Sequence, residues 1–521
     1  MQDHQTLAQF MVQNSDKLGQ QTLTHIGLTF SALFIALIVG LPLGIWISRR
    51  QRYAGVVLGF AGVMQTIPSI ALLGFLIPVM GIGAKPAITA LFLYALLPII
   101  RNTYTGITEV DASVVDAAKG MGMRPLQILR QVQIPLAMPV ILAGIRTATV
   151  ISVGVATLAA YIAAGGLGEF IFGGIALNNT NMILAGAIPA ALLAIIFDFL
   201  LSLLQKAPLN KLRKAVRILP FVFIALSSFY LLPASGKGLL AGFTPEFMGR
   251  EDGYLGLTSK YKLHIRNVVI SDAVMYKALY EKQLDVVSGY STDGRIKAYD
   301  LVTLVDDKTI FPPYYAAPLV RTDVLIKYPE LEAVLNLLSG HINDSIMTEM
   351  NYQVDVEKLL PEAVAKKFLV KTGLYKNPRQ GNKGTIRLGS KIFGEQYILI
   401  EMYKMLVEGN TDLQVQTRTG LGGTKICFDA LNLGEIDMYP EYTGTGLLVI
   451  LQPSQNIVSD LMGNPDKAYQ YVRENFLKNY QLSWLKPIGF NNAYALMMRR
   501  EQANELGIKT ISDLKRVVHE Q

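Results

Sequence analysis

The chain has 521 residues, 51% of them hydrophobic and 17% charged, with a formal net charge of +8. This composition is too apolar for an ordinary soluble protein, and the chain is too long for one domain. The single cysteine, Cys427, excludes an internal disulfide framework. Long apolar runs end near Leu232, and charges occur every few residues from Phe243 onward. We therefore expect a membrane part, 1–233, followed by a soluble domain, 234–521.

The membrane part contains apolar segments of the length that a bilayer requires, roughly 20 residues. Residues 1–20 are polar, and no small-residue cleavage site follows the first apolar run, so this run is expected to be a retained span and not a signal peptide. Six spans are predicted, near 24–47, 56–80, 87–105, 138–160, 183–204 and 217–233.

The links between these spans alternate in charge. Lys and Arg cluster in 48–55, in 101–130 and in 205–217. The link 161–182 has neither residue, and the link "GIGAK" between the second and third spans has only Lys85. Positive charge marks the cytoplasmic side of a membrane. Both ends of the membrane part are therefore expected to face outward, which makes the soluble domain extracellular or periplasmic. The basic charge is then a topology signal, and we expect no nucleic-acid partner.

Ionisable residues inside the predicted spans are few, and Asp198 is the clearest. A charge at membrane depth is costly and is often functional. The alternative is that Asp198 faces the interior of the helix bundle or lies close enough to the interface to be solvated. The scarcity of such groups argues against an ion-coupled carrier, which needs titratable residues along its path.

One cytoplasmic segment, 114–139, carries charge, glycines and prolines between two apolar spans. It reads as a helix ending near Gly122 and a second short helix with Pro125 early in it and Pro135 ending it. An apolar stripe on the second helix suits docking into a groove on a partner, although a lipid-facing amphipathic loop has the same composition. The stripe consists of Leu126, Ile128 and Leu129.

This segment resembles the EAA signature of bacterial ABC importer permeases, which reads Glu-Ala-Ala, three residues, Gly, nine residues and Ile-x-Leu-Pro. The spacing is kept throughout, with Asp in place of Glu, Val in place of Ile and Ile in place of Leu. In that family the segment is the coupling helix that seats in a cleft of the ATPase subunit. The resemblance therefore assigns ATPase coupling to Asp116, Ala117, Ala118, Gly122 and Pro135.

ATP chemistry is expected on a separate subunit, because the chain has no G-x-x-x-x-G-K-[ST] phosphate loop; "GLGGTK" at 420–425 lacks the spacing. ATP and Mg²⁺ would bind that ABC ATPase subunit, leaving this chain without a cofactor or metal. With one coupling loop in each chain, a homodimer with two ATPase copies is expected. Its surroundings would be the lipid of the bacterial cytoplasmic membrane.

The soluble domain alternates β-like runs with helical stretches, which predicts an α/β fold of two lobes around a cleft. Six of its strings resemble the extracytoplasmic solute-binding proteins for glycine betaine, choline and carnitine, a group that includes ergothioneine binders. They are "IRLGSKIFGEQYILIEMYKML", "TGLGGTKICFDALNLGEIDMYPEYTGTG", "IGFNNAYALMMRR", "GFTPEFMGREDGYLGL", "GYSTDGRIKAYDL" and "FPPYYAAPLV". The resemblance implies an all-α six-helix ABC importer permease fused to a periplasmic-binding-protein-like domain.

The order of these strings departs from the family, in which the "GSK" lobe comes first and "GFTPEF" follows the crossover. Here "GFTPEF" comes first and "GSKIFGEQ" follows a polar link, which resembles a circular permutation. Polar, exposed breaks of this kind are tolerated. We expect 234–375 to hold the second lobe and the return to the first lobe, 376–384 the linker, and 385–521 the first lobe and crossover.

Tyrosines in the matched strings are the candidate cation site. A quaternary ammonium forms no ordinary hydrogen bonds and is held by aromatic faces, whose quadrupole attracts the cation. The resemblance assigns a cage to Tyr290, Tyr442, Tyr494 and one or both of Tyr314 and Tyr315. Taken singly, each of these tyrosines is better explained by core packing, whereas four of them in four matched strings are a stronger signal for the cage.

The same ligands often carry a carboxylate, and the resemblance assigns polar recognition to Arg250, Lys391, Gln396, Thr424 and Thr445. Helix N-termini offer free amides to an anion, and arginine offers a planar fork. The alternative for Arg250 and Lys391 is a surface ion pair with an acid such as Glu251 or Glu395.

The sequence therefore predicts a membrane subunit of an ATP-driven importer that captures glycine betaine, choline, carnitine or ergothioneine. A ligand-sensing receptor would explain the outer domain but not the coupling loop. A membrane enzyme is disfavoured because no H-E-x-x-H metal pair and no clear nucleophile–base pair occur.

Overall fold

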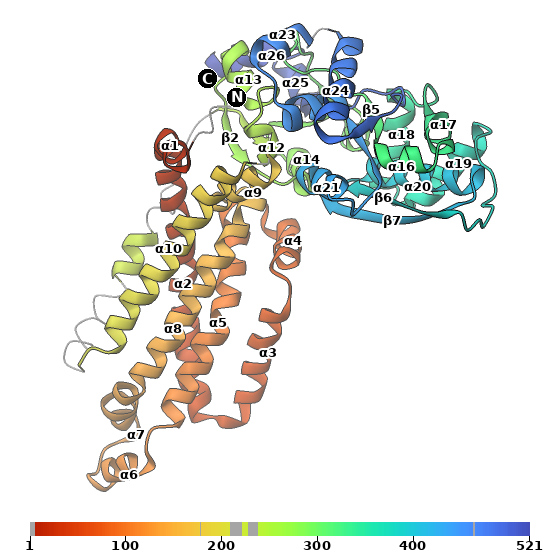
Figure 1. Ribbon diagram of the computed structural model, residues 1–521. Coiled ribbons are helices and arrows are strands. Elements are labelled where there is room, and N and C mark those ends of the chain that lie inside the picture. The colour runs from red at the N-terminus through yellow and green to blue at the C-terminus, as the bar shows by residue number, and fades with distance from the viewer. Residues whose placement is uncertain (1–5, 178, 209–220, 228–237, 462–463, 521) are drawn as a thin grey trace. The chain divides into compact units, whose positions relative to one another are not determined.

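The computed structural model describes residues 6–177, 179–208, 221–227, 238–461 and 464–520. These residues form two compact units (Figure 1). The first is helical and contains 1–174, 180–236 and 268–271, and the second contains 175–179, 237–267 and 272–521. The expectation of a helical part followed by an α/β part is confirmed.

The helical unit is built on long apolar helices. Its helices are α1 (Leu7–Gln13), α2 (Ser15–Arg49), α3 (Ala54–Thr66), α4 (Ser69–Met80), α5 (Ala84–Thr108), α6 (Ala112–Gly120), α7 (Pro125–Ile128), α8 (Ile134–Ala156), α9 (Gly168–Ala176) and α10 (Thr180–Gln205).

Four stretches in the described residues are long and apolar enough to cross a membrane, namely α2, α5, Pro125–Tyr161 and α10. The predicted span 56–80 is broken instead. Helices α3 and α4 meet at an angle of 98°, and the break falls at Ile67–Pro68 because proline lacks an amide hydrogen and disfavours a helical residue before it. Counting this pair, the described residues hold up to five spans. The sixth prediction, 217–233, lies largely outside them; its described part, 221–227, is helical.

Helices α2, α5 and α8 cross at glycines. A Cβ on Gly44 of α2 would lie 2.6 Å from Cβ of Thr103 in α5, and one on Gly144 of α8 would lie 2.6 Å from Cβ of Asn102. Small residues at such crossings let helix backbones approach closely, which is how membrane helices gain packing energy in lipid.

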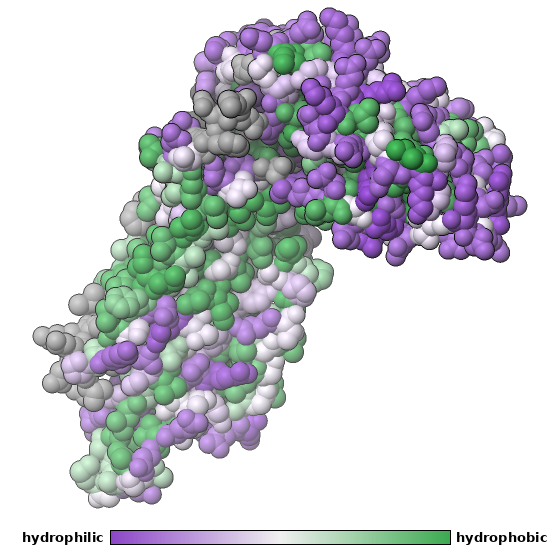
Figure 2. Space-filling model, viewed as in Figure 1, coloured by the Kyte–Doolittle hydropathy of each residue, from purple (hydrophilic) through white to green (hydrophobic). Residues whose placement is uncertain are grey.

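Much of the face of this unit seen in Figure 2 is apolar, with green side chains along the helices between smaller hydrophilic patches. Large hydrophobic side chains of α3 and α10 are exposed, among them Phe60 at 61%, Ile195 at 63% and Phe199 at 60%. A soluble unit of this size would bury such residues, so this surface is suited to lipid or to another membrane protein.

The α/β unit has two five-stranded sheets, which define its lobes. The second lobe has the strand order β2-β1-β3-β10-β4, with β1 (Leu240–Phe243), β2 (Arg266–Val269), β3 (Val286–Tyr290), β4 (Leu301–Thr303) and β10 (Tyr494–Arg499). The first lobe has the order β7-β6-β8-β5-β9, with β5 (Ala316–Arg321), β6 (Gly384–Lys391), β7 (Leu413–Gly422), β8 (Met438–Tyr442) and β9 (Leu482–Trp484).

Helices follow the strands in both lobes. In the second lobe they are α12 (Pro245–Met248), α13 (Tyr254–Gly256), α14 (Asp272–Tyr280), α15 (Arg295–Ala298), α25 (Arg500–Glu505) and α26 (Ile511–Glu520). In the first lobe they are α16 (Thr322–Lys327), α17 (Glu330–Leu335), α18 (Asp344–Asp355), α19 (Pro361–Lys371), α20 (Gly394–Asn410), α21 (Thr424–Asn432), α22 (Thr443–Thr445), α23 (Gln455–Leu461) and α24 (Pro465–Tyr480).

The two sheets differ in whether their strands come from one continuous stretch of the chain. All first-lobe strands lie in one stretch, 316–484, whereas the second lobe takes four strands before this stretch and β10 after it. The chain therefore crosses between the lobes twice, in 304–315 and in 485–493. Residues 376–383 form a mostly exposed loop from α19 to β6, and α19 packs against α20, so this loop joins two parts of the first lobe.

Candidate functional site

The predicted coupling loop is an exposed pair of short helices joined by a tight turn. Asp111 caps α6 by accepting a hydrogen bond from the backbone of Ser113 at 2.8 Å. Gly122 adopts a φ of 77°, and a Cβ there would meet no atom within 4 Å. Glycine is therefore required by the left-handed backbone and not by crowding. Arg49 at the end of α2 donates to the carbonyl of Pro125 at 2.8 Å, which ties the turn to the long helices.

The residues of the signature divide by exposure. Asp116 and Ala117 are exposed, whereas Ala118 is 1% exposed and anchors α6. The carboxylate of Asp116 accepts a hydrogen bond from Lys119 at 2.8 Å. The loop therefore exposes the acidic side chains of Asp111 and Asp116 and the small side chain of Ala117.

Two expectations about this loop were wrong. Of the predicted apolar stripe only Leu126 is exposed, at 56%; Ile128 and Leu129 are 5% and 7% exposed, and Leu129 packs into the core of the helical unit. Pro135 does not end the second helix. It lies in the first turn of α8, where its missing amide costs little, directly after a π-helical turn at Leu129–Gln133 that continues the helix.

Asp198 is paired within the bundle. Its two oxygens accept from Nε and Nη2 of Arg146 in α8 at 3.0 and 2.8 Å, and Nη1 of Arg146 donates to Gln205 at 2.6 Å. Sequence reasoning missed Arg146, although it lies within the predicted span 138–160. The spacing of Asp198 and Gln205, seven residues on one helix, places both on the same face and was the available signal.

In the α/β unit, rings from five matched strings form one continuous series of contacts. Tyr442 and Phe393 have centroids 6.3 Å apart, and Phe393 and Tyr290 lie 6.2 Å apart with ring planes 14° from parallel. Tyr290 continues to Tyr494 at 5.1 Å, and Tyr494 to Tyr314 at 5.8 Å. The series joins the lobes, because Tyr442 ends β8 whereas Tyr290 ends β3 and pairs with Tyr494 across the sheet.

Phe393 is the ring that sequence reasoning missed. It stands between β6 and α20 in "GSKIFGEQ", where attention went to the polar residues, and it lies between Tyr442 and Tyr290 in the ring series. An aromatic residue beside two predicted ligand residues was the signal that could have found it.

Tyr314 and Tyr315 have different surroundings. Tyr314 is 3% exposed, meets Tyr494 edge to face, and has its hydroxyl bonded to Arg250 and Asp252. Tyr315 is half-buried, and its backbone amide donates to the hydroxyl of Thr443 at 3.0 Å. Tyr314 is therefore the member of this pair that joins the ring series.

Lys391 and Gln396 lie beside Tyr442 and are buried. Lys391 donates to Glu441 at 2.6 Å and stands 5.3 Å from the centre of the Tyr442 ring. The amide of Gln396 donates to the hydroxyl of Tyr442 at 3.2 Å and to the carbonyl of Pro440 at 2.9 Å. Lys391 thus forms a buried ion pair with Glu441, and the expected surface ion pair with Glu395 is not formed.

Arg250 is enclosed by acids. Its Nε and Nη2 donate to the two oxygens of Asp252 at 2.7 and 2.9 Å, and Nη1 donates to Glu246 at 3.0 Å. Its guanidinium is 5.2 Å from the centre of the Tyr494 ring. Asp252 and Glu246 are its partners, whereas Glu251 is exposed. The nearby carboxylate of Asp252 raises the pKa of Arg250 further above its usual range, against the effect of burial.

Thr424 and Thr445 are buried at the ends of short elements. Thr424 is 5% exposed and is the first residue of α21, after Gly423 at the N-cap. Thr445 is 6% exposed and ends α22, three residues after Tyr442.

Glu395 is the second residue that sequence reasoning missed as part of this site. It is 3% exposed, and its carboxylate accepts hydrogen bonds from both lobes and from the crossover. Burial raises its pKa, and the hydrogen bonds that it accepts act in the opposite direction. The donors are Tyr442 at 2.5 Å, Asn492 at 2.9 Å, Thr292 at 2.8 Å and Asn351 at 2.9 Å.

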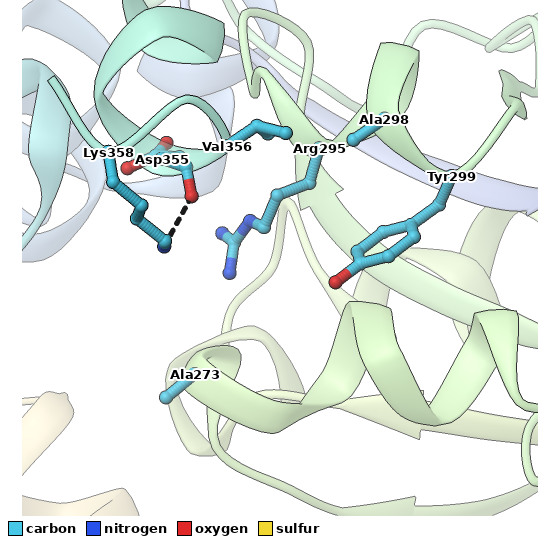
Figure 3. A pocket seen from close by; sticks show the side chains of 7 residues that line it. All are labelled: Ala273, Arg295, Ala298, Tyr299, Asp355, Val356 and Lys358. Atoms are coloured by element: carbon cyan, nitrogen blue, oxygen red, sulfur yellow. Dashed lines mark hydrogen bonds between the residues drawn. The ribbon is translucent and has the colours of Figure 1, made fainter.

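A pocket of about 390 Å³ lies between α15 of the second lobe and the end of α18 in the first lobe (Figure 3). Arg295 points into it from one side, and Asp355 and Lys358 lie on the other; Lys358 donates to the backbone carbonyl of Asp355 at 2.5 Å. Burial and the neighbouring Asp293 raise the pKa of Asp355 to about 6. The remaining lining residues are Ala273, Ala298, Tyr299 and Val356.

Each of the two units matches a known protein family. The model for the substrate binding domain of the ABC-type glycine betaine transport system matches residues 232–371 and 384–521. The model for the inner membrane component of binding-protein-dependent transport systems matches residues 36–214. The chain belongs to both of these ABC importer families.

Relatives match the same parts. The choline transport system permease protein OpuBB of Bacillus subtilis (strain 168) is 44% identical over 200 residues, which cover 38% of this chain and 92% of the relative. The osmoprotectant import permease protein OsmW of Salmonella typhimurium (strain LT2) is 46% identical, covering 38% and 94%. The ergothioneine transport permease/ergothioneine binding protein EgtU of Helicobacter pylori (strain G27) is 27% identical over 485 residues, covering 66% and 88%.

These matches confirm several of the expectations from the sequence. The chain is an ABC importer permease fused to a substrate-binding domain; it is a transport subunit and not an enzyme, and ATP hydrolysis belongs to a separate ATPase subunit. It is a multi-pass protein of the inner membrane, with the binding domain on the extracytoplasmic side.

Proposed function

We propose that the α/β unit captures a quaternary-ammonium compound, which the membrane unit then passes inward in an ATP-driven cycle. The candidates are glycine betaine, choline, carnitine and ergothioneine. The observation that carries this proposal is the ring series from Tyr442 through Phe393 and Tyr290 to Tyr494, which spans both lobes. Aromatic faces are the groups that attract a cation unable to form hydrogen bonds.

The names of the relatives support the same class of ligand. OpuBB is named for choline and EgtU for ergothioneine, and both compounds carry a trimethylammonium group. Relatives that differ in the rest of their ligands thus share the group that the rings would hold.

Within the site, Tyr290, Phe393, Tyr442 and Tyr494 would enclose the cation, and Tyr314 would hold Tyr494 from its edge. Tyr315 would support the crossover through its backbone. The remaining polar end of the ligand would meet Gln396, Thr424 and Thr445. Arg250 and Lys391 would bind a carboxylate only by exchanging their present acid partners.

The assembly that we propose is a homodimer of this chain in lipid with two ATPase subunits. ATP and Mg²⁺ would bind those subunits. The exposed Asp116 and Ala117, the turn at Gly122 and the anchoring Ala118 would seat the loop in each ATPase, and Pro135 would start the helix that carries motion into the bundle.

Six spans and a circular permutation of the binding domain are parts of the same proposal. The helical segment 221–227 supports the sixth span. The permutation is supported by the uninterrupted first lobe, the exposed loop 376–383 and the family match, which leaves out residues 372–383. We place the boundary between the membrane part and the binding domain at 233/234.

The proposal is tested by binding calorimetry of the full chain in nanodiscs against the four compounds. We expect saturable binding of at least one of them, and stimulation of ATP hydrolysis by that compound when the ATPase subunit is added. Absence of binding for all four would refute the assigned ligand class, whereas binding without stimulated hydrolysis would refute the coupling.

A further inference from the structure

Among the described residues, Glu395 is a buried acid without a cationic partner. It lies in the first turn of α20, and its four hydrogen-bond donors are the neutral side chains of Tyr442, Asn492, Thr292 and Asn351. Among the ion pairs of the described residues, none includes Glu395. A buried charge of this kind is costly unless hydrogen bonds or an opposite charge compensate it.

The other buried charges near the rings are compensated. Lys391 is paired with Glu441, Arg295 with Asp293 and Asp272, and Arg250 with Asp252 and Glu246. No cation in these groups is left over for Glu395. These groups contain three cations and five acids, so the charge balance around the rings is negative, and Glu395 is the acid that forms an ion pair with none of the three cations.

The position of Glu395 connects this charge to the rings. Its Oε1 accepts from the hydroxyl of Tyr442, so the carboxylate lies one hydrogen bond behind a proposed cage ring. It is also two residues after Phe393, the ring that faces both Tyr442 and Tyr290. Hydrogen bonds to the charged form of a carboxyl group favour its ionisation. A carboxylate that accepts the hydroxyl proton of a tyrosine increases the negative charge on the face of that ring, which makes the ring more attractive to a cation.

We propose that Glu395 is a specificity-determining residue, whose unpaired carboxylate is the counter-charge for the cationic head group of the ligand. This inference rests on the proposed function. It goes beyond the rings, because an aromatic cage alone also accepts neutral groups of the same shape through hydrophobic contact. With Glu395 ionised, the site discriminates a trimethylammonium group from its uncharged carbon analogue.

The test replaces charge and keeps shape. In Glu395→Gln the side-chain oxygen still accepts from Tyr442 and Asn492, and the new amide can donate to the hydroxyl of Thr292. It can also donate to Oδ1 of Asn351 after a flip of that residue's amide, which breaks the bond from Asn351 to the carbonyl of Thr292. Full-length protein in nanodiscs is titrated with choline and with 3,3-dimethylbutan-1-ol, which has the same shape without the charge. We expect the variant to lose roughly tenfold or more in choline affinity and to keep its affinity for the neutral analogue.

The control is Glu401→Gln on the same helix, which removes a carboxylate that is paired with Lys404. It should leave both affinities unchanged. If Glu395→Gln lowers both affinities by the same factor, the residue acts by packing alone and the inference is wrong. If the wild type binds no quaternary-ammonium compound, the proposed function fails, and this result is distinct from a wild type that binds choline without dependence on Glu395.

A second measurement needs no variant of Glu395. Choline keeps its charge at all pH values used, so its affinity relative to the neutral analogue should fall as acidification protonates Glu395. The other charged groups around the rings are Glu246, Arg250, Asp252, Asp272, Asp293, Arg295, Asp355 and the Lys391–Glu441 pair. The titration is repeated in Asp355→Asn to remove an acid whose pKa is raised to about 6. A ratio that stays constant down to acid unfolding would overturn the inference even if Glu395→Gln does not fold.

Discussion

Arg146 of α8 and Asp198 of α10 lie 52 residues apart in the sequence and form a two-pronged ion pair, with distances of 3.0 and 2.8 Å. Their side chains are 26% and 39% exposed, toward a surface that lipid or another chain covers. A paired charge in that place holds two spans together and costs little only while both partners are present.

Asp198→Leu should therefore destabilise the helical unit, because it leaves Arg146 unpaired. We expect a loss smaller than the roughly 3–5 kcal/mol of a fully buried pair. The double variant Arg146→Met, Asp198→Leu should recover most of it. Thermal unfolding of the full chain in detergent measures both; a double variant no more stable than the single one would contradict a pairing role.

Gly122→Val should disturb the turn of the coupling loop, since a φ of 77° costs a β-branched residue roughly 1–2 kcal/mol. We expect weaker ligand-stimulated ATP hydrolysis by the assembled transporter and unchanged ligand binding. Gly120→Ala is the matched control, because that glycine is helical and its Cβ would also meet nothing within 4 Å. Equal hydrolysis in Gly122→Val and the wild type would count against the coupling assignment.

Leucine at Tyr290, Phe393, Tyr442 or Tyr494 keeps bulk and removes the ring face. Each change should weaken binding of the quaternary-ammonium ligand roughly tenfold or more, since a desolvated cation–ring contact is worth about 2 kcal/mol. The control is Tyr280→Leu, which changes an exposed tyrosine that contacts Tyr299 with tilted rings and lies outside the ring series. Calorimetry that finds no loss in any of the four variants would end the cage assignment.

Arg250→Ala should weaken glycine betaine and choline alike, because the fork of Arg250 is filled by Asp252 and its removal leaves a buried carboxylate unpaired. Breaking such a pair costs roughly 3–5 kcal/mol in stability. Parallel calorimetry and thermal unfolding test this. A selective loss of glycine betaine, with choline retained, would instead show that Arg250 leaves Asp252 to bind the ligand's carboxylate.

Asp355 should make the stability of the binding domain depend on pH. Its pKa in the folded protein is about 6, above the value of about 3.9 for an exposed aspartate, so its ionised form destabilises the fold above both values. Asp355→Asn should raise the unfolding temperature at neutral pH, and the gain should disappear as the pH falls from about 6 to about 4. A gain that is the same at both pH values would exclude titration as its cause.

The EAA-like spacing singled out 114–139, and its coupling role stays a prediction. Hydropathy and loop charge were enough to predict the helical part and its orientation. They could not predict the break at Ile67–Pro68, because a proline inside an apolar run is compatible with both a kinked and a broken span. The buried side of the coupling loop was also missed. Whether Ile128 and Leu129 face a partner or their own bundle depends on how the loop folds back, which periodicity does not contain.

In the binding domain, the strings located the rings but not the charges behind them. Tyr290, Tyr442 and Tyr494 were predicted, and Phe393 and Glu395 stand in the same strings without being chosen. The partners of Arg250 and Lys391 were predicted among sequence neighbours at the surface. Lys391 pairs instead with Glu441, fifty residues away, because the pairing of β6 with β8 brings the ends of these strands together. Arg250 pairs with Asp252, two residues on, and with Glu246 of α12, whereas its immediate neighbour Glu251 faces outward.

The position of β10 has a consequence for the order in which the protein matures. This strand lies between β3 and β4 in the sheet, yet it is synthesised after the whole first lobe. Until β10 emerges on the outer side of the membrane, no strand links β3 to β4, and Tyr494 is absent from the ring series. The first lobe can fold during export, whereas a ligand site exists only once the last crossing is complete, so an incompletely exported chain holds no cargo.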